Sequence, residues 1–148
     1  MKRILILTAL LMSSWTALAQ GDLKIGPVFD GKIVPQKNMK ETFIRSSQLE
    51  PYNLKLYHSV SFIADDEILN EVSCLVLDDA DKAIEQEIHM NGGLLVYAIL
   101  TFESGNHENR FVCYKCSSKA GSHAITLVYM SGPATLDDLK KLFRTPNK

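Results

Sequence analysis

The C-terminal half of the chain contains three apolar runs that are separated by short polar segments. The runs are LLVYAILTFE (94–103), RFVCYKCS (110–117) and AITLVYMSG (124–132), and all three are rich in β-branched and aromatic residues. Runs of this composition, interrupted here by SGNHEN and SKAGSH, are typical of strands joined by hairpins. The pattern predicts a three-strand antiparallel meander.

One further strand is predicted upstream of the meander. In NLKLYHSVSF (53–62), alternate side chains fall on one side of an extended chain, namely Leu54, Leu56, His58 and Val60. Residues 20–51 contain glycines and prolines that interrupt short apolar pieces, so we expect short strands or an extended arm there.

The apolar spacing changes to three and four residues after this strand. Asp65 and Asp66 suit a helix N-terminus, and they precede the apolar positions Ile68, Leu69, Val72, Leu75 and Val76. This spacing predicts an amphipathic helix.

A second helical segment is predicted from Asp79 to Met90. Its stripe consists of Ala80, Ala83, Ile84 and Ile88. Gly92-Gly93 then suits a helix C-cap, because glycine adopts the left-handed conformation readily. The spacing leaves open whether Asp65–Met90 forms one helix or two.

A short terminal helix is predicted after Gly132-Pro133. Thr135 and Asp138 have the spacing of a capping box, and the stripe that follows is Leu136, Leu139, Leu142 and Phe143. The elements together predict an α+β fold. Its antiparallel sheet, the C-terminal meander plus one or more N-terminal strands, packs with two central helical segments and a short C-terminal helix.

Both faces of the predicted meander are apolar. In the first run, for example, Leu94, Val96 and Ala98 alternate with Leu95 and Tyr97. An antiparallel sheet with one wet face would carry polar residues at every second position. We therefore expect the helices to cover one face, and the N-terminal third of the chain, a second copy or another envelope protein to cover the other. Cover by the chain itself is the favoured reading.

The first twenty residues, MKRILILTALLMSSWTALAQ, have the pattern of a secretory signal peptide. Lys2 and Arg3 precede an apolar run, and Ala17 and Ala19 form an A-x-A cleavage site. We expect a signal peptide at 1–19 and a single α+β domain at 20–148. Since no cysteine lies near the cleavage site, we expect a periplasmic or secreted protein without a lipid anchor or a membrane span.

The charge balance argues against binding to nucleic acid. The 16 lysines and arginines nearly cancel the 17 acidic residues, which gives a formal net charge of −1 and no basic excess for phosphate contacts. A hydrophobic content of 46% also excludes a disordered chain.

Cys113 and Cys116 form the one C-x-x-C of the chain. On a strand these side chains point to opposite faces, about 10 Å apart, whereas a disulfide needs Cα atoms about 4.4 to 6.8 Å apart. A redox C-x-x-C also normally opens a helix, and a turn follows here. The sequence favours ordinary strand cysteines. With Cys74, three pairings stay open, and an odd count leaves at least one thiol free or paired between chains.

A zinc site made of His107, Cys113, Cys116 and His123 is disfavoured. The two histidines would lie at opposite ends of a strand about 26 Å long, so that only Cys116 with His123 stays conceivable. The acidic residues read as helix caps rather than ligands; they are Asp65, Asp66, Glu67, Asp78, Asp79 and Asp81.

The other histidines suit structural roles. His58 reads as a core or solvated strand residue, and His89 as a residue of the last helical turn. The chain contains no G-x-S-x-G, H-E-x-x-H or glycine-rich phosphate loop. We therefore expect no catalytic, metal or cofactor-binding residues and no cofactor.

Four segments carry a family resemblance: the leader ending Ala19-Gln20, LEPYNLKLYHS, Asp81-Lys82-Ala83 and ITLVYMSGPATLDDL. They resemble a group of small exported proteins of Gram-negative gut bacteria, catalogued as a domain of unknown function. The resemblance implies an exported single domain and assigns no residue a role.

Two classes of function stay open. The leading one is a non-enzymatic exported domain that binds a protein or another envelope or extracellular ligand, or associates with itself, through the second sheet face. The alternative is a thiol-dependent or hydrolytic enzyme that uses Cys113, Cys116 and nearby histidines.

Overall fold

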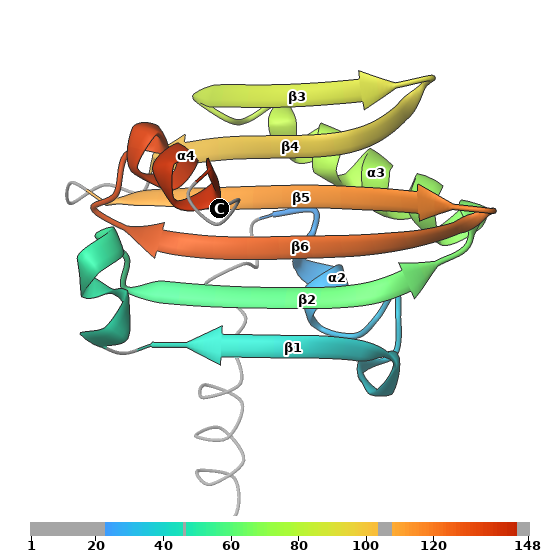
Figure 1. Ribbon diagram of the computed structural model, residues 1–148, viewed down its shortest axis with the longest axis horizontal. Coiled ribbons are helices and arrows are strands. Elements are labelled where there is room, and N and C mark those ends of the chain that lie inside the picture. The colour runs from blue at the N-terminus through green and yellow to red at the C-terminus, as the bar shows by residue number, and fades with distance from the viewer. Residues whose placement is uncertain (1–22, 46, 104–107, 145–148) are drawn as a thin grey trace, which may run out of the picture.

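A computed structural model describes residues 23–45, 47–103 and 108–144 of the chain. Its centre is one antiparallel sheet of six strands in the order β1-β2-β6-β5-β4-β3 (Figure 1). The strands are β1 (Met39–Ile44), β2 (Leu56–Ala64), β3 (Glu85–Asn91), β4 (Leu94–Glu103), β5 (Asn109–Lys119) and β6 (Ser122–Gly132). The predicted α+β class is confirmed. The leader predicted at 1–19 lies outside the described residues.

The predicted meander is confirmed as β4, β5 and β6. A two-residue turn joins β5 to β6, and both of its residues have positive φ, 53° at Ala120 and 82° at Gly121. Such turns match the twist of the strands that they connect. The strand predicted at 53–62 is β2, and β1 is one of the short strands expected in residues 20–51.

The second predicted helix, Asp79 to Met90, is wrong. The helix α3 (Asp66–Ala80) ends at Ala80, near the start of the predicted segment. Most of that segment forms the edge strand β3. Gly92 and Gly93 both have positive φ, 59° and 83°, and form the hairpin turn to β4 rather than a helix C-cap. Within the described sheet, β3 pairs with a strand on one side only. Most of its residues are exposed, so its sequence shows little of the apolar and polar alternation that marks a half-buried strand.

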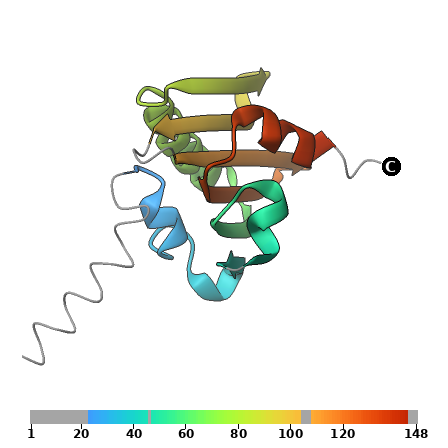
Figure 2. The ribbon, with the colours of Figure 1, turned by 90° about the vertical axis from the view of Figure 1, so that its left-hand side faces the viewer.

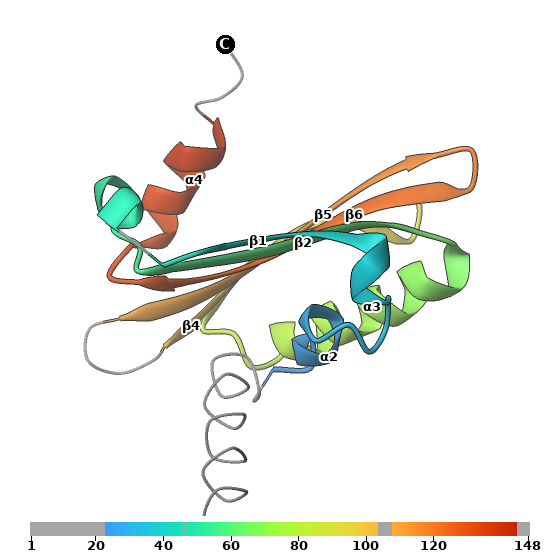
Figure 3. The ribbon, with the colours of Figure 1, turned by 90° about the horizontal axis from the view of Figure 1, so that it is seen from below.

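One face of the sheet packs against α3 and the segment around α2 (Gly26–Phe29) (Figure 3). Asp65 is the N-cap of α3, and its carboxylate accepts a hydrogen bond of 2.9 Å from the Ile68 amide. The buried apolar residues of α3 are Leu69, Val72, Val76 and Ala80. The predicted amphipathic helix is therefore confirmed.

The other face packs against α4 (Leu136–Arg144) and the short 3-10 helix η2 (Ser47–Tyr52) (Figure 2). The predicted capping box is present: the Thr135 amide donates to Asp138 Oδ2 at 3.0 Å, and the Asp138 amide to Thr135 Oγ1 at 3.2 Å. The backbone of α4 includes Leu142 and Phe143, whose side chains lie outside the described part. Another 3-10 helix, η1 (Gln36–Asn38), precedes β1.

The expectation that the chain covers its own second face is met at one end of the sheet. In Figure 3, α4 and η2 lie over that end, while this side of the sheet stays free of helices toward the β5–β6 turn. The N-terminal third contributes to both faces of the sheet. Residues 23–34 pack on the α3 face, and η2 packs on the α4 face. In the described part of the chain, no helix is both long and apolar enough to cross a membrane.

Candidate functional site

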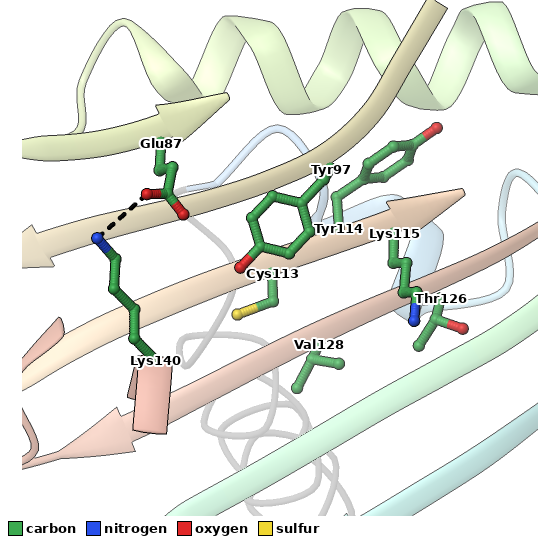
Figure 4. A pocket seen from close by; sticks show the side chains of 8 residues that line it. All are labelled: Glu87, Tyr97, Cys113, Tyr114, Lys115, Thr126, Val128 and Lys140. Atoms are coloured by element: carbon green, nitrogen blue, oxygen red, sulfur yellow. Dashed lines mark ion pairs between the residues drawn. The ribbon is translucent and has the colours of Figure 1, made fainter. Parts of the chain in front are cut away.

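A groove of about 360 Å³ lies on the α4 face of the sheet, next to the helix (Figure 4). Strands β3 to β6 and α4 provide its lining, which consists of Glu87, Tyr97, Cys113, Tyr114, Lys115, Thr126, Val128 and Lys140. Tyr114 points away from the other side chains toward α3, where its hydroxyl lies 3.4 Å from Ser73 Oγ.

The middle of the groove is apolar. Cys113 and Val128 are direct neighbours on β5 and β6, with exposed fractions of 7% and 5%. Burial raises the pKa of the Cys113 thiol to about 12, so this side chain is uncharged at neutral pH. The ring of Tyr97 lies beside Cys113 (Figure 4) and also contacts the His89 ring, with 5.5 Å between the centroids. The Tyr97 ring therefore forms an aromatic wall of the groove, beside an uncharged, apolar floor made of Cys113 and Val128.

The two ends of the groove differ in charge. At the α4 end, Lys140 Nζ lies 3.1 Å from Glu87 Oε1, and this ion pair cancels both charges. At the other end, Lys115 is exposed, and no side chain of the described residues pairs with it. Its direct neighbour on β6 is Thr126, whose hydroxyl lies 3.0 Å from Ser61 Oγ.

The two cysteines of the C-x-x-C face opposite sides of the sheet, as predicted. Cys113 belongs to the cluster under α4 and Cys116 to the cluster under α3. All three cysteines are free thiols, so none of the three pairings forms, and Cys74 is exposed on α3. The structure therefore does not bring the cysteines together at one site.

His123 is the centre of a polar network on the α3 face. Its Nε2 lies 2.7 Å from Asp66 Oδ1, and its Nδ1 lies 2.7 Å from Ser118 Oγ. Ser118 Oγ is in turn 3.7 Å from Cys116 Sγ. The network joins the start of α3 to the β5–β6 hairpin. The sequence pattern indicates Asp66 only as a helix-start residue, and no local pattern indicates its contact with His123.

The conceivable Cys116 and His123 metal pair lies within this network, with Ser118 between the two side chains. The described residues contain no group of three or more side chains that could hold a metal ion. His107 lies outside the described residues.

The other two histidines have aromatic neighbours. His58 is buried on β2, with its ring 4.8 Å from that of Phe29 and 5.1 Å from that of Phe43, and its Nε2 lies 2.5 Å from Glu41 Oε2. The core reading of His58 is therefore confirmed. The placement of His89 in a last helical turn is wrong, because it lies in β3.

Asp79 is an important residue that the sequence pattern did not reveal. Its sequence position beside Asp78 and Asp81 predicts a helix cap, but Asp79 lies in the last turn of α3 and is 0% exposed. Its carboxylate accepts hydrogen bonds from the amides of Lys24, at 2.8 Å, and Ile25, at 3.1 Å. Asp79 therefore fastens the N-terminal segment to the last turn of α3.

Comparison with models of known protein families gives a match to this chain. The model of a family described as "Family of unknown function (DUF6108)" matches residues 12–143. The match covers most of the chain and confirms the resemblance to a domain of unknown function. No curated protein matches the chain.

Proposed function

For a chain that belongs to the DUF6108 family, whose function is unknown, we propose a non-enzymatic role as an exported domain that binds a small extracellular ligand. The ligand occupies the groove between Tyr97 and α4. The observation that carries the proposal is the combination, in one groove, of an apolar floor, an aromatic wall and a lysine end.

The size and lining of the groove favour a small molecule over a protein. Sites for small ligands typically measure about 300–1,000 Å³ and combine apolar walls with a few polar groups that fix the orientation of the ligand. The groove, at about 360 Å³, falls at the low end of this range. A stable protein partner would instead need a contact of about 800 Å² on each side.

A neutral fluorescent probe tests ligand binding. N-phenyl-1-naphthylamine should bind the mature chain saturably, and Tyr97→Ala should raise its Kd about tenfold, as expected for the loss of about 1.4 kcal/mol of ring contact. Tyr57→Ala is the matched control, because Tyr57 packs against the same cluster but does not line the groove. Absence of binding, or equal effects of the two changes, would contradict the proposal.

The hydrolytic alternative has one supporting observation. The chain of contacts Asp66, His123, Ser118 contains an acid, a base and an exposed hydroxyl. These residue types also form catalytic triads, in which the base takes the proton of the nucleophile. The thiol-dependent alternative is weaker, because Cys113 and Cys116 lie on opposite faces and the Cys113 pKa is raised.

Thiol titration of the native chain distinguishes a binding domain from a thiol enzyme. With Ellman's reagent at pH 8, we expect one fast-reacting thiol, the exposed Cys74, because thiolates react and a buried thiol of pKa about 12 supplies few of them. Cys74→Ala should remove the fast phase. A fast phase that persists in this variant would instead support a reactive Cys113 or Cys116.

Export rests on the leader pattern of residues 1–19. Protein isolated from the producing cell is expected to begin at Gln20 and to carry no acyl group, because the A-x-A site has no neighbouring cysteine. Intact-mass analysis measures both properties. A mass that includes residues 1–19, or a lipid adduct, would show that the leader is not processed in this way.

A further inference from the structure

We infer that the ligand of the groove is a small amphipathic anion, with its negative group at Lys115 and its apolar body over Cys113 and Val128. The inference rests on the proposed function and adds the chemical class of the ligand. Three properties of the described residues support it: the charge at the two ends, the hydroxyl groups beside Lys115, and the apolar middle.

The charge at the Lys115 end is the first argument. Among the described residues, the lining contains two lysines and one glutamate. Lys140 and Glu87 neutralise each other at 3.1 Å, which leaves the ammonium of Lys115 as the uncompensated charge among the described lining residues. A ligand carboxylate or sulfonate at this end would provide the missing counter-charge. A cationic ligand would be repelled there.

The neighbours of Lys115 are the second argument. Direct cross-strand pairing places one row of side chains on the α4 face, namely His89, Tyr97, Lys115, Thr126, Ser61 and Lys40. The row contains ammonium, hydroxyl and imidazole groups and no carboxylate. The hydroxyls of Thr126 and Ser61 lie 3.0 Å apart, so one of the two donates to the other and the second keeps a proton for an anion.

The apolar middle is the third argument. Moving from Lys115 toward α4, the next row on the same face contains Cys113 and Val128, both buried apolar side chains. Neighbouring rows on one face are two residues apart, about 7 Å along the strands, so the positive end and the apolar floor are within reach of one small molecule. The polarity of the groove therefore matches a charged head on an apolar body.

Two probes that share an apolar core test the ligand class. 8-Anilinonaphthalene-1-sulfonate is N-phenyl-1-naphthylamine with an added sulfonate. We expect the sulfonate probe to bind more tightly to the mature chain than the neutral probe. Lys115→Gln should raise the Kd of the sulfonate probe about three- to tenfold, in the range of partly exposed charge pairs, and leave the neutral probe within about twofold.

Lys119→Gln is the matched control. Lys119 lies on the same strand and the same face, about 13 Å farther along, and it does not line the groove. It should change the Kd of neither probe.

The salt dependence of binding gives a second readout. Added salt should weaken the binding of the sulfonate probe to the unaltered chain and have less effect on its binding to the Lys115→Gln variant.

The outcomes separate this inference from the proposed function. If the neutral probe binds through Tyr97 but Lys115→Gln and Lys119→Gln have the same effect on the sulfonate probe, the anionic class is wrong and the groove remains a binding site. If neither probe binds, both the inference and the proposed function are overturned.

Discussion

Replacement of Asp79 by alanine is expected to lower the free energy of unfolding by about 3–5 kcal/mol. The fully buried carboxylate accepts hydrogen bonds from the amides of Lys24 and Ile25. Each hydrogen bond to a charged group contributes about 1.5–3 kcal/mol, and buried donors left without an acceptor add a desolvation cost. The N-terminal segment, including α2, should therefore pack more weakly against α3.

The neighbouring residue supplies the control for this change. Asp78 is exposed and lies in the same turn of α3, so that Asp78→Ala makes the same chemical change without the buried contacts. Its effect on urea unfolding should stay within about 0.5 kcal/mol. Similar losses in the two variants would mean that Asp79 acts only through helix propensity. Asp79→Asn should give an intermediate loss, because the amide keeps one acceptor oxygen.

Leu127→Ala is expected to cost about 2–5 kcal/mol, the usual range for a large-to-small change in a core. Leu127 is 0% exposed on β6, a strand at the centre of the sheet, and belongs to the cluster under α3. Strands β2 and β5 are hydrogen-bonded to the two edges of β6. They therefore cannot move in to fill the cavity that the shorter side chain would leave.

Leu94→Ala tests whether this loss comes from burial. Leu94 lies on β4 of the same sheet but is 38% exposed. Its truncation should lower the midpoint of urea unfolding less than the truncation of Leu127, with the same slope in both variants. A loss below about 0.5 kcal/mol for Leu127→Ala would be inconsistent with a core position.

Local patterns predicted the parts of the fold that local chemistry decides. The β-branched runs around Cys113 and Leu127 indicated β5 and β6, and the spacing of Thr135 and Asp138 indicated the start of α4. Alternation along a strand also placed Cys113 and Cys116 on opposite faces. Each of these predictions uses residues that lie close together in the sequence.

The failures concern residues whose environment is set by distant parts of the chain. Ile84 and Ile88 have a spacing that also fits a helix, and only the pairing of β3 with β4 decides the conformation. Asp79 resembles its acidic neighbours in sequence, and its burial depends on Lys24 and Ile25, more than fifty positions away. The groove likewise forms only when β3 to β6 and α4 meet.

The order of the strands has a consequence for synthesis of the chain. β2 ends at Ala64, but its partner β6 begins at Ser122, and β6 also pairs with β5. The polypeptide is synthesised N-terminus first. The edge of β2 that pairs with β6 therefore stays without its partner until nearly the whole domain has been made. The last strand to appear is the one that joins the two parts of the sheet. A chain that stops before Ser122 would contain β1–β2 and β3–β4–β5 as separate fragments, with no strand to connect them by hydrogen bonds.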